Sequence, residues 1–325
     1  MLNKTFFDAP MSFESDLVNL LNQVTSMEEA AGKDEAISKQ IEVLKAELYK
    51  KTEQLYANLR AIDRVEIARH PNRPRSLDYI NRLCTDFFEL AGDRRFGEDK
   101  AMVCGLANFN NRKIMLIAQE KGNNETRKLY NYGSCMPEGY RKAERAMRLA
   151  EELQIPIVTF VDTPGAYHGP VSEERGQAHA LAECISTMSQ VKVPVIACIL
   201  GEGGSGGAIA IATGNEVIIM ENAVYSVITP EGCASILWQM KDKKAEAAEA
   251  QKLTSRHLLG YKIVDRVVKE PFGGAHRDPE AAIEALGKEL EANLAKYAEP
   301  TQYLRYMQER ADRYRQNPRM DTLSG

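Results

Sequence analysis

The sequence predicts an α/β fold with a parallel sheet, because strand-like and helix-like segments alternate through its centre. Apolar, β-branched runs at 155–165 and 191–201 each end in a turn rich in glycine or proline, as buried strands do. A helical segment at 136–154, with Pro137 near its first turn, precedes the first run. This alternation is typical of layered folds with parallel strands, in which ligands bind at the carboxyl ends of the strands.

The N-terminal part of the chain, residues 1–68, is predicted to be a helical interaction arm. Between residues 27 and 62 apolar residues recur near a and d spacing, which predicts one long helix, with Ile41, Leu44, Leu48, Leu55, Leu59 and Ile62 on one face. Such a segment can pack on its own core as a hairpin or bind a partner. The Arg- and Pro-rich stretch at 69–76 ends it, so we expect a catalytic domain at 69–300. A C-terminal helix and polar tail then occupy 301–325.

Further elements follow from local pattern. Two strand-like runs at 101–109 and 113–119 flank Asn110 and Asn111, which predicts a β-hairpin. Short strands are expected within 216–228, and mostly helix after Thr229. The helix at 136–154 carries a basic stripe, which is either a solvated face or a surface for phosphate groups or an acidic partner: Arg141, Lys142, Arg145 and Arg148.

The glycine-rich turn at Gly201–Gly207 is the most informative feature for chemistry. It lies between a buried strand and an Ala/Ile helix predicted to begin near Gly206 or Gly207. The first N–H groups of a helix lack intrahelical partners, and the helix dipole adds positive charge at the same end. Two such amides can hold an oxygen that becomes negative during a reaction. The turn therefore predicts an oxyanion hole made of backbone.

Two other chemistries compete for these residues. Ser205 stands in a G-x-S-x-G sequence between a strand and a helix, with Asp265 and His276 following in the order of a hydrolase triad. The segment Asp162–Gly165 is similar to the D-x-x-G of nucleotide hydrolases, but no G-x-x-x-x-G-K-[ST] accompanies it. Four histidines are candidate general bases: His168, His179, His257 and His276. Glu202 and Glu231 flank glycine turns and either line a cleft or serve as caps.

Composition excludes several classes of protein. The net charge of −4 over 325 residues gives no basic footprint for nucleic acid, and no apolar stretch is long enough for a membrane span. The first residues contain acids and no apolar signal core, so a cytoplasmic location is expected. The cysteines form no CxxC pair, which predicts free thiols and no zinc site in this chain: Cys84, Cys104, Cys135, Cys184, Cys198 and Cys233.

Five motifs together resemble the carboxyltransferase alpha subunits of bacterial and plastid acetyl-coenzyme A carboxylase. They are PEGYRKA (137–143), PIVTFVDTPGAY (156–167), GEGGSGGAIAI (201–211), YSVITPEGCASILW (225–238) and EPFGGAHRD (270–278), and the resemblance runs from about residue 3 to about 317. It implies a crotonase-like (ClpP/crotonase superfamily) spiral of ββα units with N- and C-terminal helical extensions.

The resemblance also implies an activity. A carboxyl group passes from carboxybiotin, held on a separate biotin carboxyl carrier protein, to acetyl-coenzyme A, and malonyl-coenzyme A forms for fatty acid biosynthesis. The expected assembly is an α2β2 heterotetramer with a zinc-containing beta subunit, served by a separate, ATP-using biotin carboxylase. No side-chain base is required, since the biotin anion can take the methyl proton.

The resemblance assigns the site as well. The amides of Gly206 and Gly207 are the donors to biotin, with Gly204, Ser205 and Ala208 beside them. The turn Gly165, Ala166 and Tyr167 forms another wall of the pocket. A crotonase-like hydratase or decarboxylase of coenzyme A thioesters, which needs a carboxylate base at the mouth of the pocket, stays open as an alternative, as does an inactive scaffold.

Overall fold

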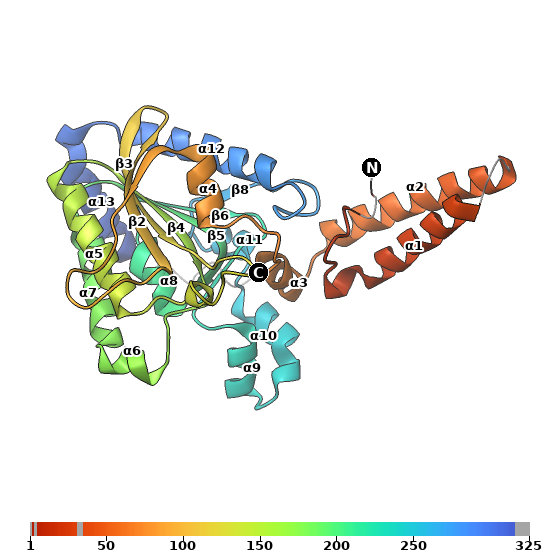
Figure 1. Cartoon of the computed structure of the whole chain (residues 1–325), viewed down its shortest axis with the longest axis horizontal. Coiled ribbons are helices and arrows are strands. Elements are labelled where there is room, and N and C mark those ends of the chain that lie inside the picture. Colours follow the sequence, from red (N-terminus) through yellow and green to blue (C-terminus); the bar gives the residue numbers. More distant parts are fainter. Residues whose placement is uncertain (1, 3–4, 31–34, 316–325) are drawn as a thin grey trace.

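The computed structural model describes residues 2, 5–30 and 35–315, and a mixed β-sheet lies at its centre (Figure 1). In the described residues the sheet has eight strands, ordered β1-β2-β3-β4-β5-β6-β8, with β7 paired to the end of β5. The strands are β1 Thr85–Glu89, β2 Met102–Phe109, β3 Arg112–Gln119, β4 Ile157–Thr163, β5 Val195–Gly204, β6 Glu216–Met220, β7 Val224–Ser226 and β8 Arg266–Val268. From β3 onward all pairs are parallel, as the sequence predicts.

The predicted hairpin is confirmed by the antiparallel pairing of β2 with β3. Its register is regular from Met102 opposite Gln119 to Phe109 opposite Arg112. Asn110 and Asn111 both have positive φ, 45° and 63°, and a two-residue turn with two positive φ angles matches the twist of the strands it joins. Asparagine tolerates this conformation better than most residues, so the local sequence sets this turn.

Helices cover both faces of the sheet (Figure 1). In β4, Thr159 Oγ1 donates to the backbone oxygen of Ile211 in α8, whereas the ring of Phe160 lies 5.8 Å from that of Tyr79 in α4. Successive strand residues point to opposite faces, so α8 and α4 lie on different sides. On the α8 side are α5 Pro137–Glu152, α7 Gln177–Gln190 and α8 Ser205–Ala212; on the other are α4 Ser76–Leu83 and α12 Pro279–Lys296.

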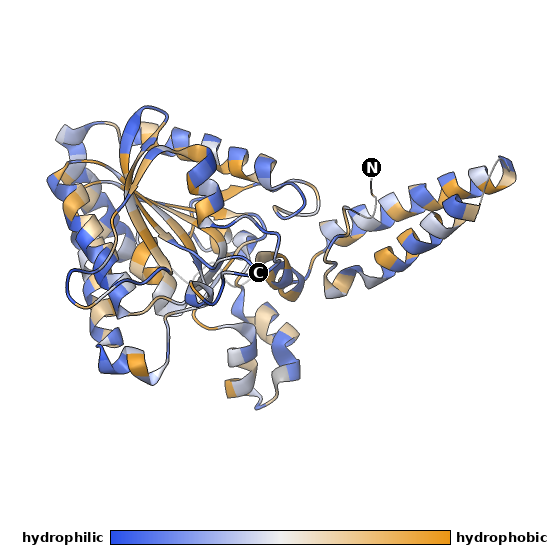
Figure 2. Ribbon diagram, in the orientation of Figure 1, coloured by the Kyte–Doolittle hydropathy of each residue, from blue (hydrophilic) through white to orange (hydrophobic). Residues whose placement is uncertain are grey.

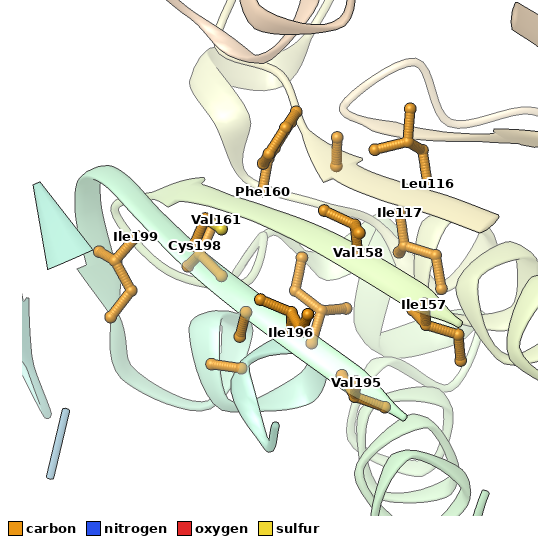
Figure 3. Close-up of a cluster of buried hydrophobic side chains, with 14 of the residues drawn as sticks. Leu116, Ile117, Ile157, Val158, Phe160, Val161, Val195, Ile196, Cys198 and Ile199 are labelled. Atoms are coloured by element: carbon orange, nitrogen blue, oxygen red, sulfur yellow. The ribbon is translucent and has the colours of Figure 1, made fainter. Parts of the chain in front are cut away.

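The core lies where these layers meet. Figure 3 shows the buried side chains of β3, β4 and β5 interleaved in it, and Figure 2 shows the sheet as the most hydrophobic part of the molecule. Further helices complete the body: α6 Pro170–Glu174, α9 Pro230–Leu237, α10 Lys244–Gln251, α11 Ser255–Gly260 and α13 Tyr303–Arg315. The 3-10 turns are η1 Ser12–Glu14, η2 Asn131–Gly133, η3 Lys241–Lys243 and η4 Pro300–Gln302.

The N-terminal region differs from the prediction. The expected single helix over 27–62 is wrong, whereas the alternative of a hairpin that packs on its own core is confirmed: α1 Ser15–Ala30 and α2 Glu35–Ala57 form a hairpin, and α3 Ala61–Ala68 packs on the body. The apolar stripe of α2 is covered by a matching stripe on α1, in a small core of Phe7, Leu17, Leu20, Leu21 and Leu48. Folding back buries both stripes, which one straight helix would leave in water. The hairpin projects from the body (Figure 1).

The hairpin is fixed to the body at its base. The buried Glu14 accepts a hydrogen bond of 2.5 Å from Arg277 Nη2. Ser12 Oγ donates to Glu66 of α3 at 2.7 Å. The ring of Phe6 stacks on Phe272 with 5.8 Å between centroids. These contacts attach the base of the arm to the body, while its role as an interaction arm stays a prediction.

The predicted basic stripe on α5 is not a continuous solvated or ligand-facing surface. Arg141 binds Asp93 and Glu138, and Lys142 is fully buried against Glu98. Arg145 donates to the carbonyl oxygens of residues 90–92. Arg148 remains largely exposed and pairs with Glu144 of its own helix. Helical spacing placed these cations correctly, but it does not show the acids and carbonyls that another segment brings to them.

The C-terminal helix α13 packs on the body. Arg310 is almost fully buried and donates to the carbonyl oxygen of Val193, at 3.1 Å, and to Asn215 Oδ1, at 2.9 Å. The polar tail predicted at the end of the chain falls in residues 316–325, outside the described residues. The domain boundaries at 68/69 and 300/301 stay predictions. No helix in the described part of the chain is long and apolar enough to cross a membrane.

Candidate active site

The candidate site lies at the carboxyl ends of β4 and β5, where two turns pack against each other. Thr163 of β4 pairs with Gly203 of β5. A Cβ atom on Gly204 would lie 2.2 Å from the carbonyl oxygen of Pro164, and one on Gly207 would lie 2.6 Å from the backbone nitrogen of Ala166. Only glycine permits backbones to approach this closely. The structure thus brings together the two turns that the sequence singled out.

Helix α8 begins at Ser205, slightly earlier than predicted, and its first turn presents unpaired donors. Gly204 is extended, Ser205 takes a left-handed conformation with φ of 53°, and the helix follows. The N–H groups of Gly206 and Gly207 donate to none of the described residues. Ser205 and Gly206 are partly exposed, whereas Gly207 and Ala208 are buried. Two adjacent amides at the positive end of a helix therefore have no hydrogen-bond partner among the described residues, and their role as an oxyanion hole stays a prediction.

Buried side chains support this turn from behind. Gln119, at the end of β3, donates from Nε2 to the backbone oxygen of Gly207 at 2.7 Å. The hydroxyl of Tyr140 lies 3.1 Å from where a Cβ on Gly207 would stand. A Cβ on Gly206 would instead meet only the Cδ2 methyl of Leu181, at 3.0 Å. Gly207 is thus enclosed, while Gly206 has a movable neighbour.

The second turn is open on one side. Gly165 has φ of 145°, and an added Cβ would meet nothing within 4 Å. The backbone nitrogen of Tyr167 donates to Cys135 O at 3.0 Å, and Gln177 Nε2 donates to the carbonyl oxygen of Tyr167 at 2.9 Å. The Tyr167 ring packs over Gly169. The turn is therefore held through its backbone beside an open space, and its role as a pocket wall stays a prediction.

A buried network of charges lies beside the glycine turn. Lys121 Nζ is 2.8 Å from Asp162 Oδ1 and 2.6 Å from Glu202 Oε2. Arg69 contacts Glu202 at 2.6 Å and Glu231, in the first turn of α9, at 2.8 Å. Burial by itself raises the pKa of Glu202, but the charges of Lys121 and Arg69 outweigh it and lower that pKa to about 2. Glu202 is thus held ionised.

Sequence reasoning missed Lys121 and Arg69. Glu202 lines a small hollow with Arg69 and Gly204, and Glu231 is an ion-pair partner of Arg69. The expectation that Glu202 lines a cleft stays a prediction. The available signal was a charged residue at or just past the end of each strand. Lys121 lies two residues after β3, Asp162 is the next-to-last residue of β4, and Glu202 lies two residues before the end of β5.

Comparison with known proteins then decides the family. The model of the family described as "Acetyl co-enzyme A carboxylase carboxyltransferase-like" matches residues 10–317. The chain is 48% identical over 286 residues to the acetyl-coenzyme A carboxylase carboxyl transferase subunit alpha of Zymomonas mobilis, covering 88% of this chain and 91% of that protein. It is 50% identical over 262 residues to the same subunit of Paraburkholderia phytofirmans, covering 80% and 81%.

The chain belongs to the acetyl-coenzyme A carboxylase carboxyltransferase alpha-subunit family. The predicted family is confirmed, and with it the predicted class of activity, that of a carboxyl-transferring enzyme. Both relatives described above are named as the carboxyl transferase subunit alpha. The family model extends over the arm, the sheet and α13.

Solved structures confirm the predicted fold class for this family member. Transcarboxylase 12S matches with a TM-score of 0.57 at 20% identity, covering 70% of this chain and 42% of that one. The beta subunit of Pseudomonas aeruginosa geranyl-CoA carboxylase matches with a TM-score of 0.56 at 17% identity, covering 75% and 46%. A Pseudomonas malonate decarboxylase hetero-tetramer, solved with coenzyme A, matches with a TM-score of 0.53 at 15% identity, covering 65% and 86%. At these identities the likeness shows the crotonase-like fold alone.

The alternative hydrolase triad is not assembled in this family member. Asp265 accepts hydrogen bonds from the Val217 nitrogen, at 2.7 Å, and from Arg313, at 2.5 Å. His276 stacks on His70 with 4.0 Å between ring centroids, and neither of its ring nitrogens has a partner among the described residues. No hydrogen bond joins either residue to Ser205 in the described part of the chain.

The nucleotide-hydrolase alternative also fails on geometry. The carboxylate of Asp162 is bound by Lys121 and by the Glu202 amide. No group of three or more His, Cys, Asp or Glu side chains among the described residues is arranged to hold a metal ion. The six cysteines are free.

Proposed function

We propose that this chain is the alpha half of a carboxyltransferase that moves a carboxyl group from carboxybiotin on a carrier protein to acetyl-coenzyme A, forming malonyl-coenzyme A. The observation that carries the proposal is the pair of unpaired N–H groups at Gly206 and Gly207, at the start of α8. Carboxybiotin supplies the carboxyl group and, once that group has left, a ureido oxygen with negative charge.

The residues present fit such an anion. Both cations beside the turn are already used: Lys121 lies between Asp162 and Glu202, and Arg69 lies between Glu202 and Glu231. Their charges are balanced by these three carboxylates, and the backbone amides of Gly206 and Gly207 are donors without a partner among the described residues. In the neighbouring turn, a Cβ on Gly165 would meet nothing within 4 Å, so the space beside that residue is open.

The two amides act by donating hydrogen bonds to developing negative charge. Their positions are set before the reaction by the close backbone packing of Gly204 and Gly207 on the neighbouring turn, so they need no reorganisation. Removing one donor of this kind typically slows a reaction by about 10²–10³. The amides of Gly206 and Gly207 thus stabilise the charge that develops on the bound group.

The hydratase or decarboxylase alternative requires a carboxylate base at the pocket. Glu202 and Asp162 are the carboxylates beside the glycine turn, and Lys121 binds both. With its pKa lowered to about 2, Glu202 is a poor proton acceptor near neutral pH. A reaction that needs no base from this chain suits the site better.

The proposal extends to partners. The alpha subunit works with a beta subunit as an α2β2 heterotetramer, with zinc in the beta subunit, a biotin carboxyl carrier protein and an ATP-using biotin carboxylase. A cytoplasmic location belongs to the same proposal. The second oxyanion hole, for the enolate of acetyl-coenzyme A, is assigned to the beta subunit.

The test is malonyl-coenzyme A decarboxylation with free biotin as acceptor, run on this chain alone and mixed with a bacterial beta subunit. We expect biotin-dependent turnover only in the mixture. A mixture without biotin is the control for uncoupled decarboxylation. If both samples are inactive, and the chain instead hydrolyses an ester in a way that Ser205→Ala abolishes, the chain is a hydrolase and the proposal fails.

A further inference from the structure

We infer that Lys121 is a positioning residue for the site: by binding Asp162 and Glu202 together, it sets the spacing of the two turns between which biotin binds. The inference rests on the function proposed above. Lys121 touches no reacting atom in it and acts through the two carboxylates.

The contacts of Lys121 join three strand ends. Lys121 comes two residues after β3, Asp162 is the next-to-last residue of β4, and Glu202 lies near the end of β5, two residues before Gly204. The two carboxylates meet the same Nζ, at 2.8 and 2.6 Å. Asp162 leads directly into the turn at residues 163–167, so the ammonium group holds the bases of both turns at once.

This cross-link replaces a part of the sheet that is missing. The pairing of β4 with β5 is regular up to Val161 opposite Ile199, and then shifts so that Thr163 lies opposite Gly203. In the interrupted stretch the backbone nitrogen of Glu202 donates to the side chain of Asp162, at 2.9 Å. Side chains thus hold the turns together where the regular ladder stops.

Two glycines pack closely against the side chains of this arrangement. A Cβ on Gly201 would lie 2.7 Å from Asp162 Oδ1, and a Cβ on Gly133 would lie 2.8 Å from Lys121 Cγ. Although burial lowers it, the pKa of Lys121 is raised overall by the charges of Asp162 and Glu202. Without the ammonium group, two carboxylates that now share one partner would repel each other at close range. The turns would move apart there.

Arg69 confines the consequences of losing Lys121 to the two turns. It continues to bind Glu202 from the other side when Lys121 is replaced, and the sheet core beneath is apolar. Loss of Lys121 is therefore expected to displace the glycine turn relative to the turn at Gly165 without unfolding the sheet. A displacement of about 1 Å in a substrate-positioning group can cost on the order of 10²-fold in rate.

The experiment compares Lys121→Met with Lys121→Arg in the mixture with the beta subunit. We expect Lys121→Met to lower kcat/KM for biotin at least about tenfold, while KM for malonyl-coenzyme A stays unchanged. Lys121→Arg keeps the charge and should recover part of the loss. The matched control is Lys192→Met, which removes an exposed lysine paired with Glu151 on the body and should change neither constant.

A second variant and a second measurement separate positioning from folding. Glu202→Gln keeps the shape of the side chain and should show the same biotin-specific loss if Lys121→Met does not fold. The inference is overturned if Lys121→Met and Glu202→Gln both keep the wild-type kcat/KM for biotin. It is also overturned if the KM for biotin and the KM for malonyl-coenzyme A rise equally and in proportion to a loss of thermal stability. An inactive wild-type mixture overturns the proposed function itself, which distinguishes the two failures.

Discussion

Gly204 and Pro164 approach so closely that a Cβ atom on Gly204 would stand 2.2 Å from the carbonyl oxygen of Pro164. This contact joins the strand end that carries the free amides to the strand end that carries Gly165. It is a contact between two backbones, so no side-chain rotation can relieve an added atom. The glycines of this turn therefore differ in how much space surrounds them, and alanine substitutions at each should differ in their cost to stability.

Gly204→Ala is expected to destabilise the chain strongly and Gly206→Ala is not. Overpacking a rigid site typically costs about 1–3 kcal/mol, and at Gly204 the neighbour is backbone. At Gly206 the neighbour is the Leu181 methyl, 3.0 Å away, which can turn aside, and alanine favours the helix by about 1 kcal/mol. Urea unfolding of the two variants measures both. Equal stability of the pair would contradict this account of the turn.

Ser205→Ala is expected to keep most carboxyl-transfer activity in the mixture with the beta subunit. Its side chain has no hydrogen bond to Asp265 or His276 in the described part of the chain, so it is not an activated nucleophile. With φ of 53°, the position penalises β-branched residues instead. Ser205→Val should lower the free energy of unfolding relative to Ser205→Ala. A loss of about 10⁴ in rate in Ser205→Ala, typical of a catalytic triad, would overturn the assignment.

The stability of the fold should fall as the pH drops below about 6.5, in part because of His276. Burial, and then the neighbouring charge of His70, lower the pKa of His276 to about 2, so the folded chain keeps it neutral. The unfolded chain takes up a proton there below its ordinary pKa. The native state is then disfavoured by about 1.4 kcal/mol per pH unit.

His276→Phe removes that proton and keeps a ring against His70. Urea unfolding between about pH 7 and pH 5 should show a shallower loss of stability in this variant than in the wild type. The exposed His168 gives the control, since His168→Gln should leave the wild-type slope unchanged. Identical slopes for wild type and His276→Phe would contradict the prediction.

Arg141→Ala should destabilise the chain far more than Arg148→Ala, although both lie on α5. Arg141 is largely buried and binds Asp93 and Glu138 at 2.7 and 2.9 Å. Removing it leaves the enclosed Asp93 carboxylate without a cation, whereas Glu138 keeps Arg175. Breaking a buried pair in this way costs about 3–5 kcal/mol. Arg148 is 59% exposed, pairs with Glu144 within its helix, an interaction of about 0.3–0.5 kcal/mol, and donates to Thr187 Oγ1 at 3.2 Å. Thermal unfolding compares them, and a similar loss in both would restore the interpretation as a surface stripe.

The sequence predicted the features that depend on neighbouring residues. Apolar β-branched runs determine β4 and β5, the Asn110-Asn111 pair determines the hairpin turn, and Pro137 marks the start of α5. The concentration of glycine before α8 located the free amides, because a helix start leaves donors unpaired wherever it occurs. The motifs also identified the family from sequence alone, because each motif is a continuous stretch of neighbouring residues.

Only the tertiary structure decided which distant residues meet. Periodicity shows that α2 has an apolar stripe, but it does not show that α1 covers it, so the predicted helix over 27–62 was wrong. The order of Ser205, Asp265 and His276 along the chain fits a triad. In the folded chain, however, Asp265 is hydrogen-bonded to Arg313, and the ring of His276 packs against His70. Lys121 likewise meets Asp162 and Glu202 only because parallel strands end at one edge of the sheet. Local pattern sets conformation, whereas the partners of a charged group depend on long-range packing, which no single segment contains.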